Sequence, residues 1–323
     1  MNDPDLRNVL VTGSSGYLGS KLVDLLDGKP DIGRIVGVDV KAPTLEREKF
    51  KFLKRDIREP LTEVLQEFDI DAIFHLAFVK IPIHDKSLME DININGALNV
   101  MRSSLESDVG QIIYASSATA YGFHRDNDNP LTESSPLRGN DNYIYTKDKK
   151  IIDGLFETFA KEHPEIKVSS VRPVFVVGKG FDDPLSEHLL DKFCLIPSKA
   201  CELQFVHEDD MMDILYLLFS RSVAGAFNVG STGTLSLKEM VKMVGSWPIP
   251  IPFPLLYGIN SVAWSLRLTF ITDEPSPGLL GLRHPWIVSS EKLRKETGYE
   301  YNYTSREAFK DWVDHVKNEA KDG

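Results

Sequence analysis

The first 178 residues alternate short runs of apolar and β-branched residues with longer amphipathic stretches. Each run is apolar at successive positions, as in strands buried on both faces of a parallel sheet. The runs cover residues 8–13, 34–40, 50–57, 72–78, 111–117 and 167–178. Helical patterns lie between them, for example at 18–27, 86–106 and 145–162. This alternation predicts an α/β fold with a doubly wound parallel sheet of the Rossmann type.

The alternation weakens after residue 178, where proline and loop residues become frequent. Residues 226–230 form one further strand-like run. We therefore expect a Rossmann domain of residues 1–178, to which residues 206–230 return. Residues 179–205 and 231–323 are expected to form a smaller C-terminal substrate lobe over the carboxyl edge of the sheet.

Residues 252–271 (PFPLLYGINSVAWSLRLTFI) are apolar over about the length of a membrane-spanning helix. They contain Arg267, Asn260, two serines and two prolines. We expect a buried or pocket-covering helix here rather than a membrane span. The alternative is an element that lies on a membrane surface or binds an apolar substrate.

Composition and charge exclude several classes of function. The net charge is −11 and no basic patch is visible, so nucleic-acid binding is not expected. The two cysteines, Cys194 and Cys201, lack metal-like spacing and form no disulfide framework, so no metal is expected. The polar, acidic start, MNDPDLRN, does not resemble a signal peptide. We therefore expect a cytoplasmic protein with two ordinary thiols.

The first predicted strand runs into VTGSSGYLG (11–19), whose glycines are spaced G-x-x-G-x-x-G. Such glycines permit a tight turn, close approach of a pyrophosphate and close packing of helix on strand. Asp39 ends the second strand about twenty residues on, where an acid can bind ribose hydroxyls. Asp39 favours NAD over NADP, because the 2′-phosphate of NADP would meet a like charge. Lys41, a cation two residues later, favours NADP instead. The residues of this loop that we expect to bind the cofactor are Gly13, Ser15, Gly16, Tyr17, Leu18 and Gly19.

Further segments follow the glycine loop in a characteristic order: RDI (55–57), HLAF (75–78), YASSATAYG (114–122), LTESSP (131–136), VRPVFVVG (171–178), FVHEDD (205–210) and FNVG (227–230). Together they resemble the extended short-chain dehydrogenases/reductases, the NAD-dependent epimerase/dehydratase family, over roughly residues 8–245. The resemblance implies that Asp56 and Ile57 border the adenine and that Pro173 meets the nicotinamide. It implies that Leu76, Ala77 and Phe78 line the phosphate and ribose groups of the cofactor. It also implies that Asn93 ties the central helix to the active-site strand.

The fifth strand ends at Ser117, which matches the family's catalytic Ser/Thr. The segment NYIYTKDKK (142–150) then offers two Tyr–Lys pairs at helical spacing, Tyr143–Lys147 and Tyr145–Lys149. On a helical wheel Tyr143 falls on the charged side, whereas Tyr145 falls on the apolar arc that faces the sheet. The residues after Lys149 also fit the family pattern better than those after Lys147. We therefore predict Ser117, Tyr145 and Lys149 as catalytic residues, with Tyr143 and Lys147 as a surface or rim pair.

The chemistry follows from these three residues. A tyrosine next to a lysine and a positively charged nicotinamide ring loses its proton more readily. Tyr145 can then exchange a proton with a substrate alcohol while a hydride moves to or from NAD. By the resemblance, Lys149 also holds the nicotinamide ribose, so both Tyr145 and Lys149 contact the cofactor.

We expect the substrate to be a small secondary alcohol or ketone, or alternatively a nucleotide sugar epimerised through a transient ketone. Ala118 and Thr119 follow Ser117, where the family's dehydratases and decarboxylases carry an extra acid, so net oxidation or reduction is favoured over these reactions. Phe175 and Leu203 stand where nucleotide-sugar enzymes of the family carry Asn and Arg, which also weakens the UDP-sugar 4-epimerase alternative. Candidate substrate residues are Lys80, Ser117, Thr119, Phe175 and Arg283.

Two further expectations complete the prediction. The apolar arc of residues 86–106 is wider than one sheet face needs, and helices at 86–106 and 145–162 pair across a two-fold axis in the family, so we expect a homodimer. A third class of function, a non-catalytic dinucleotide-binding sensor on the same fold, stays open because a fold does not prove activity.

Overall fold

The computed structural model describes residues 6–44, 46–80, 84–269 and 271–322. Its centre is a seven-stranded sheet with the strand order β11-β6-β5-β4-β1-β2-β3, in which every neighbouring pair is parallel. The strand order reverses between β1 and β4, where doubly wound folds bind their ligands at the carboxyl ends of the strands. The strands are β1 (Arg7–Thr12), β2 (Ile32–Asp39), β3 (Phe50–Lys54), β4 (Ala72–His75), β5 (Gln111–Ala115), β6 (Lys167–Pro173) and β11 (Gly225–Val229).

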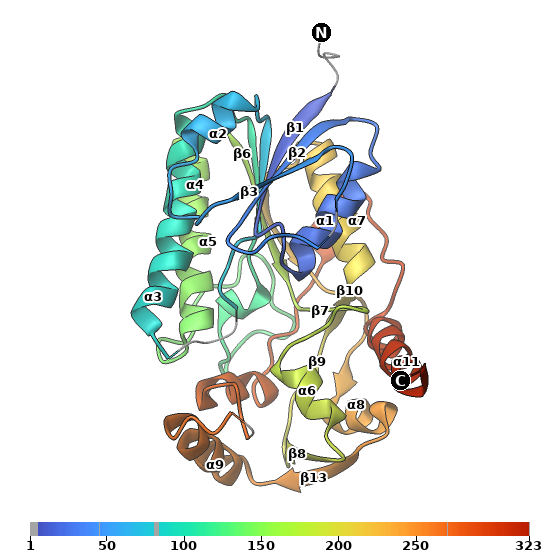
Figure 1. Ribbon diagram of the computed structural model, residues 1–323. Helices are drawn as coiled ribbons and strands as arrows, with labels where there is room; N and C mark the ends of the chain where they lie inside the picture. The colour runs from blue at the N-terminus through green and yellow to red at the C-terminus, as the bar shows by residue number, and fades with distance from the viewer. Residues whose placement is uncertain (1–5, 45, 81–83, 270, 323) are drawn as a thin grey trace.

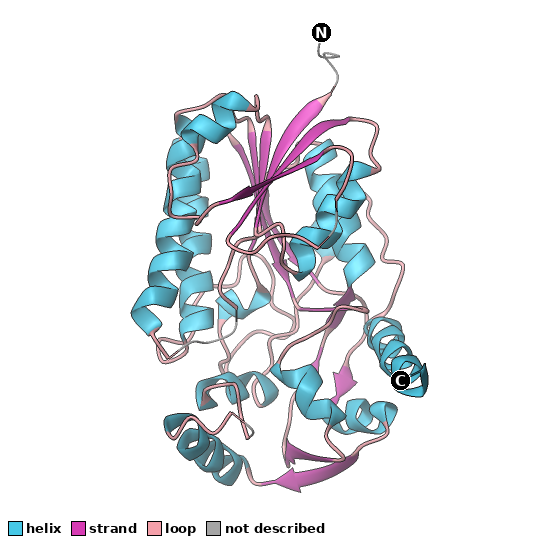
Figure 2. Cartoon of the chain, viewed as in Figure 1, coloured by secondary structure: helices cyan, strands magenta, loops and turns pink. Residues whose placement is uncertain are grey.

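Helices cover both faces of this sheet (Figures 1 and 2). One face carries α1 (Tyr17–Asp27) and α7 (Glu208–Ser220). The other carries α2 (Thr62–Glu67), α4 (Gly96–Leu105) and α5 (Ile144–Glu162). Each helix turns a stripe of apolar residues to the sheet, which buries one hydrophobic core on each face. The predicted α/β fold of the Rossmann type is confirmed.

Two predicted elements are interrupted in the structure. The helix expected at 86–106 is divided into α3 (Lys86–Glu90), a π-helical turn η1 (Asp91–Asn95) and α4. The strand expected at 167–178 is divided as well, because β6 ends at Pro173 and β7 (Phe175–Val177) pairs with β10 (Phe205–His207) in a separate sheet. Both interruptions lie at the carboxyl side of the central sheet, where π-turns and strand breaks reorient side chains.

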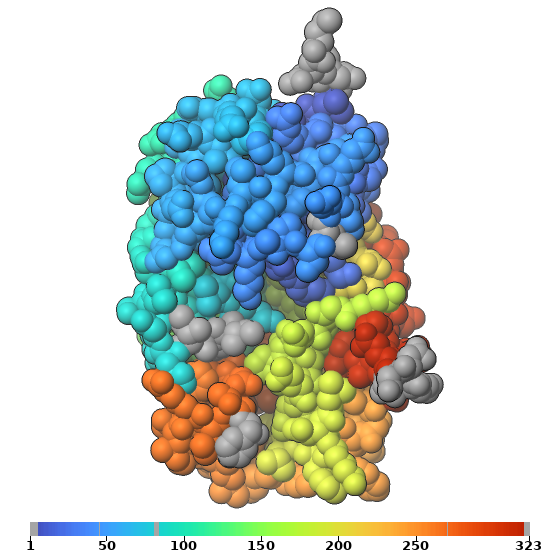
Figure 3. Space-filling view, viewed as in Figure 1, coloured from blue at the N-terminus to red at the C-terminus, as the bar shows by residue number. Residues whose placement is uncertain are grey.

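The second half of the chain supplies the small elements below the central sheet (Figure 1). In Figure 3 the blue and teal first half occupies the top of the face shown, and the yellow-green and orange second half occupies the bottom. The second half contains α6 (Pro184–Leu190), β8 (Phe193–Pro197), β9 (Glu202–Leu203), β12 (Leu235–Ser236), α8 (Leu237–Val244), β13 (Trp247–Ile251), α9 (Phe253–Ser265), η3 (Ser276–Leu282), α10 (Glu291–Thr297) and α11 (Ser305–Asp322). The short helix η2 (Ala118–Tyr121) belongs to the first half and follows β5.

The apolar segment 252–271 contains α9, which buries only part of its surface. Leu256, Asn260 and Ala263 are buried, whereas Leu255 and Val262 are more than half exposed. The expectation of a buried helix therefore holds for one face of α9 only. Among the described residues, no helix combines the length and the apolar character that crossing a bilayer requires.

Candidate active site

The glycine loop brings backbone to backbone at the carboxyl ends of β1 and β4. Gly13 has a φ of +71°, and a Cβ there would lie 2.8 Å from the Ala77 backbone nitrogen. A Cβ on Gly19 would lie 2.0 Å from the Gly13 carbonyl oxygen, so only glycine lets α1 begin this close to β1. The open backbone before the N-terminus of α1 fits a pyrophosphate, which the free N–H groups would bind.

Asp39 lies next to this loop at the end of β2. Its Oδ2 accepts the Ser15 N–H at 3.0 Å, and its Oδ1 accepts the Lys41 N–H at 3.0 Å. Each carboxylate oxygen keeps a lone pair for a ribose hydroxyl, so the fit to NAD is retained. The side chain of Tyr17 points elsewhere: its hydroxyl donates to Glu208 of α7, which also pairs with Lys21 at 2.7 Å. Leu18 packs against the apolar core on this face of the sheet.

The residues predicted to border the adenine follow β3. Arg58 holds the Asp56 carboxylate through Nε at 3.0 Å and Nη2 at 2.6 Å, and this contact lowers the pKa of Asp56. Ile57 is buried and packs against Gly96 at the start of α4. Asp56 is thus fixed in orientation before any ligand arrives.

Asn93 links three segments around the candidate site. Its Oδ1 accepts the Val79 N–H at 2.8 Å, and its Nδ2 donates to Asp148 of α5 at 2.9 Å. Because Asn93 lies in the π-helical turn, this turn ties Val79, the residue after Leu76–Ala77–Phe78, to α5. Pro173 ends β6, buried, at the same edge of the sheet.

Ser117, Thr119 and Tyr145 form one hydroxyl cluster at the end of β5. The Ser117 Oγ accepts the Thr119 N–H at 3.1 Å and the Thr119 hydroxyl at 2.9 Å. Burial raises the pKa of Tyr145, while hydrogen bonds with the Ser117 and Thr119 hydroxyls lower it. The structure therefore brings the predicted Ser–Tyr pair together, and it adds Thr119 to the cluster.

Lys149 lies one helical turn after Tyr145 and is buried. Its Nζ donates to the Ala115 carbonyl at 2.7 Å and lies 3.9 Å from the centre of the Phe78 ring. The same ring packs edge-on against Tyr145, with centroids 5.5 Å apart. Burial lowers the pKa of Lys149 to about 7, against the opposing effect of Asp153 and Asp148. The arrangement holds a cation and a phenol on two sides of Phe78.

The prediction that Tyr143 lies on the solvated side is wrong. Tyr143 is buried, with a relative exposure of 7%, and its ring centroid lies 6.1 Å from that of Tyr145. Helix α5 begins at Ile144, and Tyr143 is its N-cap residue with extended φ and ψ of −127° and 103°. The helical wheel therefore does not describe this side chain. Lys147 does lie at the rim, where it pairs with Glu90.

The predicted substrate residues lie in different surroundings. Phe175 belongs to an aromatic wall, with ring centroids 5.1 Å from Trp286 and 5.6 Å from Phe205. Lys80 is exposed and donates to the Asp182 carbonyl at 3.2 Å. Arg283 is exposed and stacks 4.8 Å above the Phe253 ring.

Sequence reasoning missed two carboxyl groups near the phenols. Glu274 hydrogen-bonds Tyr143, and the negative charges of Glu274 and Asp183 both raise the pKa of Tyr145. Asp183 could have been noticed as the residue before a proline at a helix start. Nothing in the sequence around Glu274 marks it, since it lies in a loop of no regular pattern.

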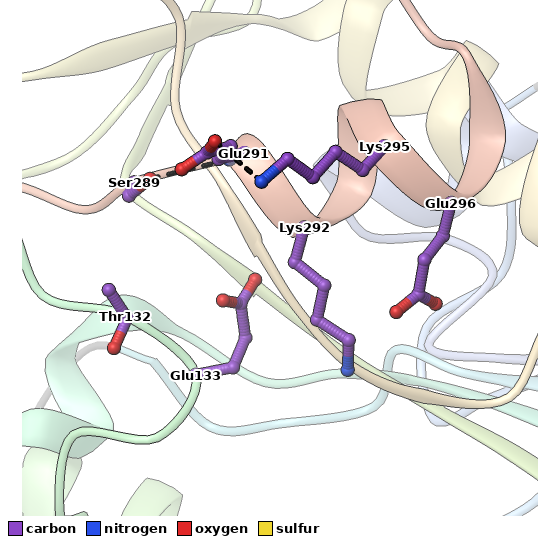
Figure 4. Close-up of a pocket in the computed structure, with 7 residues that line it drawn as sticks. All are labelled: Thr132, Glu133, Ser289, Glu291, Lys292, Lys295 and Glu296. Atoms are coloured by element: carbon purple, nitrogen blue, oxygen red, sulfur yellow. Dashed lines mark hydrogen bonds and ion pairs between the residues drawn. The ribbon is translucent and has the colours of Figure 1, made fainter.

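A separate pocket of about 380 Å³ opens between residues 132–133 and helix α10. It is lined by Thr132, Glu133, Ser289, Glu291, Lys292, Lys295 and Glu296 (Figure 4). None of the predicted site residues belongs to it. Within the described residues, no three His, Cys, Asp or Glu side chains come together as a metal site requires.

A family model and several known proteins match this sequence. The model of the NAD dependent epimerase/dehydratase family matches residues 9–230. An uncharacterized protein of Mycobacterium tuberculosis is 26% identical over 315 residues, which is 94% of this chain and 82% of that protein. The UDP-glucose 4-epimerase of Lactobacillus helveticus is 28% identical over 204 residues, covering 59% of this chain and 58% of that enzyme.

Solved structures share the fold over nearly the whole chain. The dTDP-glucose 4,6-dehydratase of Bacillus anthracis, in complex with NAD, superposes with a TM-score of 0.76 at 16% identity and covers 98% of both chains. The UDP-glucose 4-epimerase of Thermotoga maritima, with UDP-glucose, gives a TM-score of 0.75 at 19% identity and covers 97% of this chain and 99% of that one.

Proposed function

Because the chain belongs to the NAD dependent epimerase/dehydratase family, we propose that it transfers a hydride at a secondary alcohol or ketone through Ser117, Tyr145 and Lys149. The NAD dependence of the family confirms the cofactor predicted from the glycine spacing and Asp39. The observation that carries the proposal is the contact of Tyr145 with the Ser117 hydroxyl beside a buried Lys149.

Each residue has a defined task in this proposal. Ser117 orients the substrate oxygen, with Thr119 fixing the Ser117 hydroxyl at 2.9 Å. Tyr145 accepts the alcohol proton in oxidation and returns it in reduction. Lys149, buried and cationic when protonated, favours the phenolate. Bound NAD supplies the hydride acceptor, or in its reduced form the hydride donor.

The test is a cofactor-reduction screen. Purified protein with NAD is expected to produce NADH, read by its absorbance, with secondary alcohols that lack a diphosphate. A panel that pairs such alcohols with UDP-glucose and UDP-galactose separates the alternatives. Interconversion of the UDP-sugars without net NADH would replace this proposal by a 4-epimerase. NAD binding without turnover of any member would favour a dinucleotide-binding sensor.

The 4-epimerase is the second candidate because the curated relatives and solved structures include UDP-glucose 4-epimerases. In such a reaction the same Tyr145 would take the proton and return it while the ketone turns in the site. We place this alternative second because Phe175 and Leu203 stand where nucleotide-sugar enzymes of the family carry Asn and Arg.

We also propose that residues 179–205 and 231–323 act as the substrate-binding lobe, that the protein is cytoplasmic, and that it forms a homodimer. The dimer contact would be made by α4 and α5, where Leu98 and Leu155 are only partly buried. Light scattering at micromolar concentration is expected to give the mass of two chains, and the mass of a single chain would contradict the dimer.

A further inference from the structure

Exposed apolar side chains gather on residues 247–271, which form β13, α9 and the segment after it. Figure 1 places β13 and α9 at the end of the molecule opposite the N-terminus, and the orange atoms at the bottom of Figure 3 include them. The large apolar residues that are at least 39% exposed here are Trp247, Ile249, Leu255, Ile259, Val262, Leu266 and Ile271. Apolar side chains that are clustered in this way, rather than scattered singly, mark a contact surface.

Helix α9 has a second apolar face, which points away from the protein. At about 100° per residue, its exposed members fall within an arc of about 60°. They are Leu255, Ile259, Val262 and the C-cap residue Leu266. Residues 253–265 include no charged side chain. No ionised group of α9 would therefore have to leave water if this face were covered by an apolar medium.

The two-stranded sheet of β8 and β13 extends this surface. Its register places Trp247 beside Phe193, and both side chains are more than half exposed. The Trp247 N–H donates to the Lys192 carbonyl on the β8 side, so the alternate residues Pro248 and Pro250 face the other edge of β13. Proline has no N–H to donate, so this edge is unsuited to pairing with a strand of another chain.

Cations border the apolar patch, by which we mean Phe193 and the exposed apolar residues of 247–271. The Arg283 guanidinium lies 4.8 Å from the ring centre of Phe253, the first residue of α9. Arg267 is exposed two residues after the end of α9. Lys192 is exposed as well, and its Nζ lies 5.7 Å from the centre of the Phe193 ring. Both ends of α9 and the aromatic pair thus have a cation beside them.

Carboxylates are missing from the same segments. Residues 192–201 and 240–271 contain no Asp or Glu, although the whole chain has a net charge of −11. Their charged residues are Lys192, Lys199, Lys242 and Arg267. Of the carboxylates that flank these segments, Glu239 forms an ion pair at 2.7 Å and Asp191 lies 3.5 Å from His188. This local positive charge complements an anionic surface, and it disfavours a second copy of the same patch, whose cations would be repelled.

We infer that the apolar patch is a membrane-docking surface, which lies on a bilayer that contains anionic lipids. Helix α9 has 13 residues and a length of about 20 Å, too short for a hydrocarbon core of about 30 Å, so it lies along the bilayer surface rather than across it. The exposed face of α9 enters the boundary of the acyl chains, Trp247 lies at the level of the headgroups, and the bordering cations meet the lipid phosphates. The inference does not depend on the proposed redox function.

Vesicle sedimentation with the full chain tests this surface. The probes are vesicles of phosphatidylcholine alone and vesicles in which about one third of the lipid is phosphatidylserine. The protein is expected to bind the anionic vesicles at least about tenfold more tightly than the neutral ones, since each Lys or Arg near the surface adds attraction. Raising the ionic strength should weaken this binding, because salt screens the attraction.

Variants in the two parts of the patch locate the effect. Val262→Glu and Trp247→Glu should each lower the affinity for anionic vesicles at least about tenfold, because a carboxylate resists leaving water and is repelled by the headgroups. The double variant Lys192→Gln/Arg267→Gln should remove most of the preference for anionic over neutral vesicles.

Leu6→Glu is the matched control. Leu6 is also an exposed apolar residue, at 39%, and it precedes β1 at the opposite end of the molecule (Figure 1). The same added charge should lower the affinity there by less than about twofold, because it is remote from the patch and screened by salt. Thermal unfolding of each variant should match that of the unaltered protein, since all the changed residues are exposed.

Three results of the vesicle experiment would overturn the inference: no binding to either kind of vesicle, equal binding to both kinds, or an equal loss from Leu6→Glu and Val262→Glu. Light scattering distinguishes a lipid surface from a protein partner. A lower mass for Val262→Glu than for the unaltered protein would show that the patch joins copies of the chain, which would overturn the inference too. Absence of NADH formation in the alcohol screen would count against the proposed redox function alone.

Discussion

Replacing Tyr145 with phenylalanine is expected to lower kcat by about 10²–10⁴-fold, the usual contribution of a positioned acid or base, while NAD binding persists. The hydroxyl removed is the one that meets Ser117 and Thr119, whereas the ring can still pack edge-on against Phe78 at 5.5 Å. The chemistry should therefore be lost without loss of the fold. Initial rates on an alcohol found by the screen, together with calorimetry for NAD, measure the two effects separately.

Tyr143→Phe is the matched control. It removes a hydroxyl that meets Glu274 rather than Ser117, so kcat should fall by less than about tenfold and any loss should appear chiefly in KM. If Tyr143→Phe abolished turnover and Tyr145→Phe spared it, the assignment of the catalytic tyrosine would be reversed.

The pH dependence of the reaction rate is a second test of Tyr145 as the proton-transferring residue. Burial raises the pKa of Tyr145 in the protein without cofactor, and a neighbouring positive charge lowers it. Because phenolate accepts the proton in alcohol oxidation, the oxidation rate should rise with pH until Tyr145 is deprotonated. Ketone reduction needs the protonated phenol and should fall over the same range.

The sequence predicted correctly those features that a few neighbouring residues determine. Continuous apolar runs such as residues 8–13 and 111–117 predicted buried parallel strands, and the structure has β1 and β5 there. The spacing of Gly13 and Gly19 predicted a close backbone approach, and the structure has no room for a Cβ at either position. These features depend on a few neighbouring residues, so they can be recognised without the tertiary fold.

The remaining features depend on contacts between distant segments. The apolar pattern of 86–106 could not reveal the π-helical turn, because that turn serves the hydrogen bonds of Asn93 to Val79 and Asp148. The wheel misplaced Tyr143 because α5 begins one residue later. Glu274 reaches the site only through the packing of α9, which no local pattern encodes.

Arg172→Met is expected to have the largest effect on stability, a loss of about 3–5 kcal/mol in the free energy of unfolding. Arg172 of β6 and Asp153 of α5 form a buried ion pair, with side-chain exposures of 3% and 1%. Nε and Nη2 donate to the two carboxylate oxygens at 2.9 and 2.8 Å, and Nη1 donates to the Tyr121 hydroxyl at 3.0 Å. Removing the guanidinium leaves a carboxylate without its countercharge in the core.

The same substitution should also disturb the position of the candidate site residues, because Asp153 is bonded to the segment that carries them. Asp153 accepts from Ser116, the residue before Ser117, at 2.5 Å, and it lies one helical turn after Lys149. Chemical denaturation measures the stability, and the double variant Arg172→Met/Asp153→Leu should recover most of the loss because no unpaired charge remains. Lys161→Met removes an exposed pair with Glu157 on the same helix and should cost less than about 1 kcal/mol. Equal losses from Lys161→Met and Arg172→Met would contradict the expectation that the buried, multiply hydrogen-bonded pair stabilises the fold more than the exposed one.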